Sequence, residues 1–462
     1  MLVWADVYDE FAMSSLSQPL TTTDHQGDAR RWRVAVIGSG VSGLGACWRL
    51  KTEGLPVHVT LLEADAHFGG HAHTQDITLE GQTFPVDTGF LVYNERTYPS
   101  LIDLFAHLQV PVAPSDMSFS VQVRSSCGSE LEWSGSSLAT VFAQRSNLFK
   151  PRFWGMLSDI LRFNRLATAL AQTSLDSEQP VQRFLDEHRF GANFREHYLL
   201  PMIGCIWSCP VDQMLQFPMA TLLRFCHNHG LLQVSDRPQW YTIKGGSRQY
   251  VQKIVELLDE AHLNCPVRSV HRSPKGVEID TGRGLETYDA VVFATHPDQT
   301  LGMLAQGASA LEREVLGKLS YQANRAVLHT DARMLPTRRS AWAAWNYERS
   351  VLATQAHAPV CLHYWINRLQ PLPWATPVMV SLNPIRPIPA EHVHAEMEYE
   401  HPVFDGPAIR AQARVPELQG HLRSWFCGAW CAYGFHEDGL NSGLRAADLL
   451  TRALATAGAA HD

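Results

Sequence analysis

The chain has 462 residues, of which 45% are apolar and 18% charged, so it can bury a large core and does not have the composition of a disordered protein. A single core rarely grows beyond about 250–300 residues, which predicts two domains. The net charge is −8 and there is no long basic block, so nucleic acid is not an expected partner.

Cysteine usage and the first residues of the chain indicate the compartment. The nine cysteines are scattered and include no C-x2-C pair, which is the spacing of zinc ribbons and redox motifs. We therefore expect reduced thiols, no metal site and a cytoplasmic protein. No apolar run is long enough to span a membrane. Residues 1–31 carry acids and lack an apolar segment, which predicts a disordered leader rather than a signal peptide, with Met13 as an alternative start to Met1.

The first ordered unit is expected to begin at Arg33. Residues 34–37 form a continuous apolar run, which is typical of a parallel strand buried on both faces. A helix is predicted over 44–51 and a second strand over 57–62, which completes a βαβ unit. Between the first strand and the helix stand Gly38, Ser39, Gly40, Val41, Ser42 and Gly43.

This glycine-rich run matches a dinucleotide-binding fingerprint. The first glycine permits a tight turn, the second lets a pyrophosphate approach the backbone, and the third lets helix and strand pack closely. The helix start offers free N–H groups to phosphate. Glu63 follows Gly43 by 20 residues, where an acid accepts hydrogen bonds from ribose hydroxyls. The fingerprint predicts a dinucleotide but does not choose between FAD and NAD.

The remaining pattern predicts a composite architecture. Residues 98–232 are expected to be mainly helical, and Gly245-Gly246 opens a helix over 247–262. Strands are predicted near 267–270, 277–279, 288–294, 326–329, 342–347, 360–366, 378–382 and 424–427, and a last helix over 440–455. Because the nucleotide-binding pattern is interrupted twice, we expect a second domain inserted twice into the first.

A resemblance carried by residues 61–74 indicates which of the two cofactors is expected. Their sequence, LLEADAHFGGHAHT, resembles the L-E-A-x-x-x-x-G-G-R segment of flavin amine oxidases, whose relatives include protoporphyrinogen oxidase and phytoene-type desaturases. The resemblance implies FAD, an α/β Rossmann-like FAD-binding domain of the glutathione-reductase type, and an inserted α+β substrate domain. The FAD-binding domain would comprise 32–97, 236–300 and 420–462, and the substrate domain 98–235 and 301–419.

Further short segments extend this resemblance from about residue 33 to 455. They are 86–90, Gly245-Gly246, the strand at Val267 whose backbone would contact adenine, and the Gly428 and 439–443 segments. The resemblance implies that FAD contacts the fingerprint residues together with Glu63, Ala64, Gly69, Gly70, His71, Thr88, Gly89, Phe90, Val267, Gly428, Asp438, Gly439 and Leu440.

Several motifs also look like one bacterial group of flavoproteins. They are residues 69–74, 237–240, 345–347, 401–405 and 434–439. Members of that group are often encoded beside methyltransferases similar to cyclopropane-fatty-acid synthase, and a few are linked to desaturation of methyl-branched acyl chains toward furan fatty acids. This likeness implies an apolar acyl substrate.

Three substitutions separate the chain from the amine oxidases. His71 stands where their pattern has an arginine that touches FAD phosphates, and it is either a packed polar residue or a hydrogen-bond partner of the cofactor. Asn324 aligns with their lysine near flavin N5, and the loss of that lysine argues against ordinary amine oxidation. His436 occupies one of the two aromatic positions that frame an amine, and it offers a proton acceptor instead.

Two acids follow His436 at the predicted start of the last helix. Glu437 is either a catalytic residue or an exposed structural acid. Asp438 is either a cofactor contact or a helix N-cap alone. The predicted catalytic set is therefore His436, Asn324 and Glu437.

Two other features bear on the substrate and the membrane. The aromatic residues Trp342, Trp345, Tyr347, Tyr364 and Trp365 either fill the core of a sheet or line a substrate tunnel. Residues 145–170 mix apolar and basic side chains. This mix fits either a helix packed on a core or peripheral contact with the inner face of a membrane.

We expect a FAD-dependent oxidoreductase that moves a hydride from substrate to flavin N5 and a proton to a base. The helix start near 438–441 would stabilise the reduced flavin. A single complete fingerprint is present, so we expect no NAD(P)H site and reoxidation by oxygen or another acceptor. The alternatives are a flavin amine oxidase and a flavin-carrying partner protein without turnover.

Overall fold

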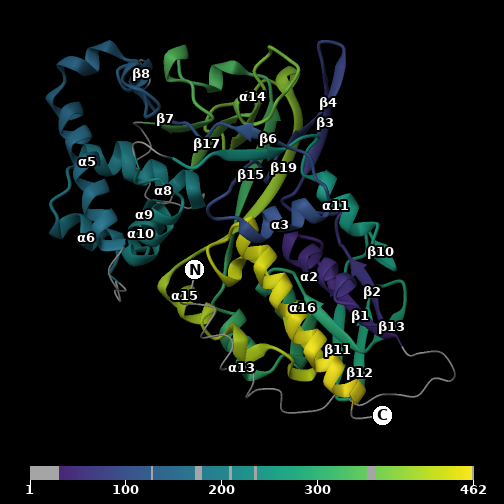
Figure 1. The fold of residues 1–462 in the computed structure, drawn as a ribbon. Coiled ribbons are helices and arrows are strands. Elements are labelled where there is room, and N and C mark those ends of the chain that lie inside the picture. The colour runs from purple at the N-terminus through teal and green to yellow at the C-terminus, as the bar shows by residue number, and fades with distance from the viewer. Residues whose placement is uncertain are drawn as a thin grey trace.

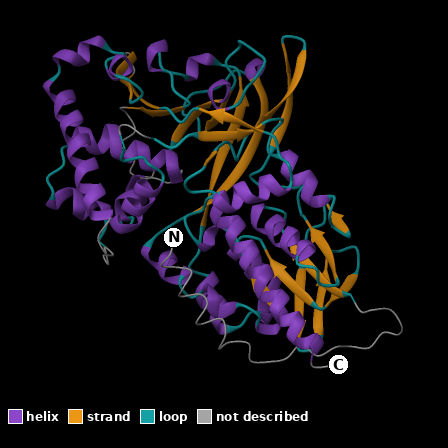
Figure 2. Cartoon of the chain, viewed as in Figure 1, coloured by secondary structure: helices purple, strands orange, loops and turns teal. Residues whose placement is uncertain are grey.

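The strands of the molecule form two groups that lie apart, with helices packed around each (Figure 1, Figure 2). The computed structural model describes residues 31–125, 128–171, 179–207, 211–233, 237–350 and 360–459. Apart from Arg31, the predicted leader over 1–31 lies outside these residues. None of the helices in the described ranges is long and apolar enough to cross a membrane.

A parallel sheet of five strands forms the first group, as buried apolar runs predict. Its order is β10-β2-β1-β14-β20, and every neighbouring pair is parallel. The bounds are Trp32–Ile37 (β1), Val57–Leu62 (β2), Glu260–His262 (β10), Ala290–Phe293 (β14) and Ser424–Phe426 (β20). Three separated stretches of chain therefore build one sheet, which confirms the predicted Rossmann-like fold class.

Two different layers cover the faces of this sheet. Helices α2 and α16 lie side by side on one face (Figure 1), and the antiparallel strands β11, β12 and β13 cover the other. The bounds are Val41–Thr52 (α2), His436–Ala459 (α16), Ser269–Ser273 (β11), Gly276–Asp280 (β12) and Leu285–Tyr288 (β13). Alternate residues of β1 enter the two layers, because successive side chains of a strand point to opposite faces: Val36 joins one core and Ile37 the other.

The second group is a mixed sheet of seven strands in the order β19-β15-β18-β17-β16-β7-β8. Its neighbours are antiparallel except β16 and β7, which run parallel. The bounds are Phe119–Ser125 (β7), Gly128–Ser134 (β8), Tyr321–His329 (β15), Trp345–Ser350 (β16), Cys361–Trp365 (β17), Met379–Leu382 (β18) and Val393–Pro402 (β19). The residue boundaries predicted for the two domains stay a prediction.

Smaller elements complete the chain. One hairpin pairs β3 with β4, and a three-stranded sheet has the order β5-β9-β6. The bounds are Thr74–Leu79 (β3), Gln82–Asp87 (β4), Tyr93–Asn94 (β5), Val112–Ser115 (β6) and Trp240–Ile243 (β9). Helices beside the larger sheet, at the left in Figure 1, are Pro151–Ala171 (α5), Val181–Glu187 (α6), Ala192–Phe194 (α7), Leu200–Trp207 (α8), Val211–Gln216 (α9) and Met219–Asn228 (α10). The others are Pro99–His107 (α3), Leu138–Val141 (α4), Arg248–Val255 (α11), Pro297–Leu304 (α12), Ala310–Leu316 (α13), Ile366–Leu369 (α14) and Gly406–Gln412 (α15).

The prediction that residues 98–232 are mainly helical is wrong for 112–134, where β6, β7 and β8 lie. Strand β7 has Val121 and Val123 on one face and Ser120 and Gln122 on the other, and all four side chains are buried. Apolar and polar residues alternate along β7, which is the local pattern of a strand, but the prediction followed the helical spacing of the segments around it.

Two helix boundaries also differ from the prediction. The helix predicted over 247–262 ends at Val255, because residues 260–262 pair with β2 as an edge strand of the parallel sheet. The last helix begins at His436 rather than at Leu440. The second difference matters for function, since it places His436, Glu437 and Asp438 inside the first turn of α16.

We predict that Gly443→Ala destabilises the protein. A Cβ at Gly443 would overlap the backbone oxygen of Ser42 in α2, so the two helices would have to separate. Such overpacking costs about 1–3 kcal/mol. The matched control is Gly155→Ala in α5, where an added Cβ meets nothing within 4 Å and should stabilise by about 0.5–1 kcal/mol. Urea denaturation of both variants measures their free energies of unfolding. Equal changes in the two variants would contradict the tight contact between α2 and α16.

Candidate functional site

A cavity of about 1160 Å³ opens at the carboxyl ends of the parallel strands. Its walls include Gly38 after β1, Glu63 after β2 and Ala294 after β14. Ligands of open α/β sheets bind at this edge. The volume exceeds the roughly 300–1000 Å³ of ordinary small-molecule pockets, so a dinucleotide and a substrate can share it.

Most of the predicted cofactor residues line this cavity. They are Gly38, Ser39, Gly40, Val41, Ser42, Glu63, Ala64, Gly70, His71, Gly89, Phe90, Val267 and Gly428. Their convergence from segments that are far apart in the sequence is what a single extended ligand requires. Their individual contacts with FAD stay a prediction.

The start of α2 is built to receive phosphate. Gly40 precedes the helix, no side chain caps it, and a Cβ there would meet nothing within 4 Å. The first backbone N–H groups of a helix have no intrahelical partner, so those at Val41 and Ser42 can face an anion. Gly38 has φ +96°, and a Cβ there would lie 2.7 Å from the oxygen of Ala294, so only glycine fits.

Glu63 connects this loop to the expected ribose position. Its Oε2 accepts hydrogen bonds from Ser39 N (2.8 Å) and from Ser39 Oγ, and its Oε1 accepts one from Asp65 N (2.9 Å). A carboxylate has about four acceptor sites, so capacity remains for ribose hydroxyls. Glu63 therefore both shapes the glycine loop and fits the predicted cofactor contact.

A neutral histidine occupies the position that holds arginine in the amine oxidases. His71 stacks on Tyr399 with ring centroids 4.8 Å apart, and its buried Nε2 has no hydrogen-bond partner among the described residues. Burial lowers the pKa of His71 well below its usual value, with further lowering from neighbouring histidines. An unpartnered buried nitrogen in the cavity wall fits a polar edge of a bound flavin.

His436 also faces the cavity. Its ring stacks on Phe90 with centroids 3.7 Å apart, and its Nε2 lies 3.4 Å from the hydroxyl of Tyr250. Burial lowers the pKa of His436 to about 3, so the imidazole is neutral at physiological pH. A neutral imidazole can accept a proton, and the low pKa makes it a weak base.

Two of the three predicted catalytic residues do not line the cavity. Asn324, on β15, is buried behind it, and its side chain lies 3.0 Å from Nδ1 of His401, which does line it. Glu437 accepts hydrogen bonds from Ser100 N (2.9 Å) and Leu101 N (3.0 Å) at the start of α3. In this structure Asn324 contacts His401 and Glu437 caps the start of α3, and their catalytic roles stay a prediction.

Six of the predicted cofactor residues are not among the residues that line the cavity, and their contacts with FAD stay a prediction: Gly43, Gly69, Thr88, Asp438, Gly439 and Leu440. Gly43 and Gly439 allow close packing, and Leu440 fills the contact between α16 and α2. Asp438 lies inside the first turn and accepts a hydrogen bond from Phe435 N (3.0 Å), so it is not the N-cap itself.

Sequence reasoning missed Tyr399, His401 and His296. All three line the cavity, the first two from β19 and the third before α12. His401 lies in the 401–405 motif, one of those that resemble the bacterial group of flavoproteins. That motif was the sequence feature that could have marked it as a site residue. The register that sets Asn324 opposite Tyr399 on β15 and β19 is what brings this strand to the site.

Two of the five aromatic residues considered for a substrate tunnel line the cavity, and the tunnel itself stays a prediction. Trp345 and Tyr364 line the cavity, with ring centroids 4.9 Å apart. Trp342, Tyr347 and Trp365 do not line it. Tyr364 and Trp365 are adjacent on β17, so their side chains point to opposite faces of the strand.

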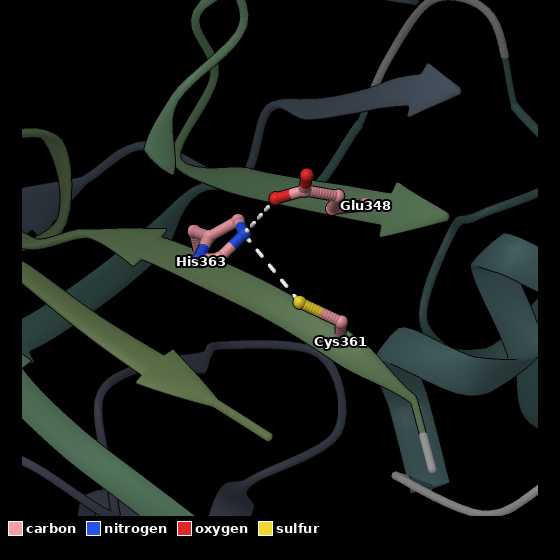
Figure 3. A group of neighbouring side chains, drawn as sticks. All are labelled: Glu348, Cys361 and His363. Carbon is pink, nitrogen blue, oxygen red and sulfur yellow. Dashed lines mark hydrogen bonds and ion pairs between the residues drawn. The ribbon is translucent and has the colours of Figure 1, made fainter. Parts of the chain in front are cut away.

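Glu348, Cys361 and His363 form a buried cluster with the residue types of a metal site (Figure 3). Their ligand atoms are already engaged. Glu348 accepts from Arg386 Nε (2.8 Å) and Nη2 (2.8 Å), from Arg124 and from His363 Nε2 (2.8 Å). A carboxylate between two arginines is neutralised without a cation, so we assign the cluster a structural role.

Asp87 links the cavity segment to the larger sheet. Its carboxylate accepts from Ser247 N (2.8 Å), from Thr74 Oγ1 (2.6 Å) and from Gln370 Nε2 (2.7 Å), while Asp87 N donates to Gln370 Oε1 (3.0 Å). Burial raises the pKa of Asp87 to about 6, which leaves it ionised at neutral pH. Four segments of chain thus meet at the residue that precedes Thr88, Gly89 and Phe90.

Comparison with known proteins gives this site a context. A family model described as flavin containing amine oxidoreductase matches residues 41–329. Protoporphyrinogen oxidase 2, chloroplastic/mitochondrial, of Arabidopsis thaliana is 27% identical over 197 residues, which are 41% of this chain and 36% of that enzyme. The chain therefore matches little more than a third of that curated relative.

Two solved structures show the same fold at low sequence identity. Cyclohexylamine oxidase from Brevibacterium oxydans has a TM-score of 0.64 and 16% identity, covering 92% of this chain and 100% of that one. The CLA-producing fatty acid isomerase from P. acnes has a TM-score of 0.61 and 16% identity, covering 92% of this chain and 99% of that one.

We predict that Asp87 and Gln370 form an energetically coupled pair. In Asp87→Asn an amide N–H2 would face the amide N–H2 of Gln370, so the free energy of unfolding should fall by about 1–3 kcal/mol. Adding Gln370→Glu reverses the polarity of both partners and should recover at least half of the loss. Denaturation at pH 7 of the two single variants and the double variant gives the coupling energy, and additive losses would refute it.

Proposed function

This chain belongs to the flavin containing amine oxidoreductase family, with FAD as its cofactor, and we propose that it oxidises an uncharged, apolar substrate of the fatty acyl class. The family places the chain among FAD-dependent oxidoreductases. Desaturation of an acyl chain of a lipid, including a methyl-branched chain, is the specific reaction proposed. Reoxidation by oxygen or another acceptor completes the cycle.

The observation that carries this proposal is the uncharged far end of the cavity. Its lining includes Met202, Ile206, Phe225, Leu231, Trp345 and Tyr364. The charged side chains among the described lining residues lie elsewhere. They are Glu63, Asp65 and Arg268 on the nucleotide side, and Glu398 and Glu400 on β19.

Charge distinguishes an esterified acyl chain from two other substrate types, a free fatty acid and an amine. A buried ion without a partner costs several kcal/mol, so a free carboxylate or an ammonium group is disfavoured at this end. An esterified acyl chain leaves its polar head outside and brings only apolar surface, with about 0.8 kcal/mol gained for each buried CH₂ group. The substrate that fits is therefore an acyl chain within a larger lipid.

The fold accommodates both acyl and amine chemistry. A fatty acid isomerase and cyclohexylamine oxidase share it with this chain. Flavin amine oxidation is the second candidate, since the family name includes it. A flavin-carrying protein without turnover is the alternative of another class.

FAD, when bound, accepts a hydride equivalent from the substrate. The start of α2 and Glu63 would hold the dinucleotide, while His71, Phe90 and Gly428 would contact the flavin side. His436 is the proposed acceptor of the proton lost from the neighbouring carbon, since it is neutral and faces the cavity. The apolar wall excludes water from the reacting atoms.

We predict that acyl phospholipid bleaches the FAD-loaded protein under anaerobic conditions. Hydride transfer removes the absorbance of oxidised flavin, so a spectrophotometer follows it directly. Bleaching by primary amines instead would favour the amine oxidase, and bleaching by neither would favour the carrier protein. Rapid reduction by NADPH would contradict the absence of a nicotinamide site.

We predict that Ile206→Trp slows this bleaching by about tenfold or more, because it fills the apolar end where a methylene group is worth about 1 kcal/mol. Ile206→Ala, the matched variant, enlarges the same end and should shift the preferred chain length upward. FAD affinity should be unchanged in both, since residue 206 is remote from the nucleotide segments. Equal bleaching rates in both variants would place the substrate elsewhere.

We also propose that residues 145–170, the segment predicted for membrane contact, rest on an anionic bilayer surface together with Leu138. Five of the nine exposed large apolar side chains in the described ranges lie between 138 and 161, and Phe149 is 87% exposed. The segment carries five basic residues and one acid, Asp159, which pairs with Arg162. Helix α5 lies at the outer edge of the helical group (Figure 1).

Vesicle sedimentation tests this surface. Wild type should bind vesicles that contain phosphatidylglycerol and release them at high salt, because each Lys or Arg near such a surface is worth about 1 kcal/mol. Lys150→Glu with Arg152→Glu should weaken binding roughly 30-fold, and Phe149→Ser should weaken it further. Leu285→Ser removes an exposed leucine elsewhere and should have no effect. Unchanged binding in the charge variant would exclude the surface.

A further inference from the structure

A chain of hydrogen bonds behind the cavity has a fixed polarity. It starts at the backbone of β15, where Arg325 N donates to Asn383 Oδ1 over 3.0 Å. A peptide N–H can only donate, so the oxygen of this amide must face it. The amide nitrogen of Asn383 therefore donates to Asn324 Oδ1 (2.7 Å) and to Val360 O (3.1 Å).

The next link fixes the tautomer of a cavity histidine. Because Asn324 receives a hydrogen bond at its oxygen, its nitrogen faces Gln322 O (3.2 Å) and His401 Nδ1 (3.0 Å). An amide nitrogen offers only N–H donors, so Nδ1 of His401 is the acceptor. In a neutral ring the proton then stands on Nε2.

Neighbouring groups keep this ring neutral. Burial, with a smaller contribution from His296, lowers the pKa of His401 to about 4. His71 faces the ring from the Gly70 loop, with centroids 5.2 Å apart. His296 is paired with Glu400 (3.0 Å), so this acid is already engaged.

We propose that His401 is a dedicated hydrogen-bond donor in the cavity wall, held in its Nε2–H form by the Asn383–Asn324 relay. Its ligand is an uncharged acceptor, either a ring nitrogen or carbonyl of the flavin or the ester carbonyl of the substrate. The inference deepens the proposed function and rests on it, since the acceptor belongs to the cofactor or to the acyl substrate. His401 is consequently not the base of the reaction, and Asn324 is a positioning residue.

Nitrogen NMR of protein carrying ¹⁵N-labelled histidine tests the tautomer without turnover. Wild type should show His401 with Nδ1 unprotonated and Nε2 protonated between pH 6 and pH 8. The ring is neutral in this range because its pKa is lowered. In Asn324→Asp the carboxylate can only accept, so Nδ1 should become protonated. The exposed Asn228→Asp adds the same charge elsewhere and should leave the His401 signals unchanged.

The same spectra identify the acceptor. A shift of the Nε2–H signal on adding FAD alone assigns the flavin, and a shift only on adding a saturated phospholipid to the FAD-loaded protein assigns the ester carbonyl. No shift with either, or an unprotonated Nδ1 in Asn324→Asp, would overturn the proposal. Because these signals need no turnover, they decide the role of His401 even where no acyl substrate bleaches the flavin.

The rate of flavin reduction in two variants of His401 tests the donor role a second way. His401→Gln keeps an N–H donor at this position, whereas His401→Leu removes it, and loss of a donor to a reacting group typically costs about 10²-fold in rate. We expect the leucine variant to reduce its flavin about 10²-fold more slowly and the glutamine variant to retain most of the rate. Equal losses in both, with FAD affinity unchanged, would indicate a packing role instead.

Discussion

The close approach of α2 and α16 is the constraint on which the site depends. Ser42 and Gly443 meet so tightly that no side chain fits at residue 443. This contact carries the C-terminal segment onto the N-terminal βαβ unit, although about 400 residues separate them in the sequence. The glycine loop at 38–43 and the loop at 428–436 therefore both contribute to the lining of one cavity.

Neutral polar groups characterise the part of the cavity expected to face the flavin. His71, His401 and His436 are all kept uncharged by burial, which disfavours the protonated form of imidazole. A wall of this kind offers hydrogen bonds without fixed charge. It suits a reaction on an apolar chain, because a permanent charge beside that chain would cost free energy each time a substrate displaced the water around it.

Local sequence rules recovered the parts of the fold that local physics determines. The strand, glycine loop and acid from Val34 to Glu63 form one contiguous unit, and its geometry follows from chain stereochemistry alone. Strand β7 carries the local alternation of a strand, but the prediction treated residues 98–232 by the helical spacing of the segments around it. The position of Asn324 behind His401 depends on the pairing of β15 with β19, and pairing across 77 residues is a property of the whole sheet.

The first turn of α16 shows why residue type alone did not settle the catalytic set. Successive residues of a helix are about 100° apart, so three neighbours must point in three directions. His436 faces the cavity, Glu437 reaches the start of α3, and Asp438 turns back to Phe435 N. Glu437 compensates the positive end of α3 and so joins the helix that carries His436 to a segment of the substrate side. Glu437, one of the predicted catalytic residues, thereby ties the turn that carries His436 to the start of α3.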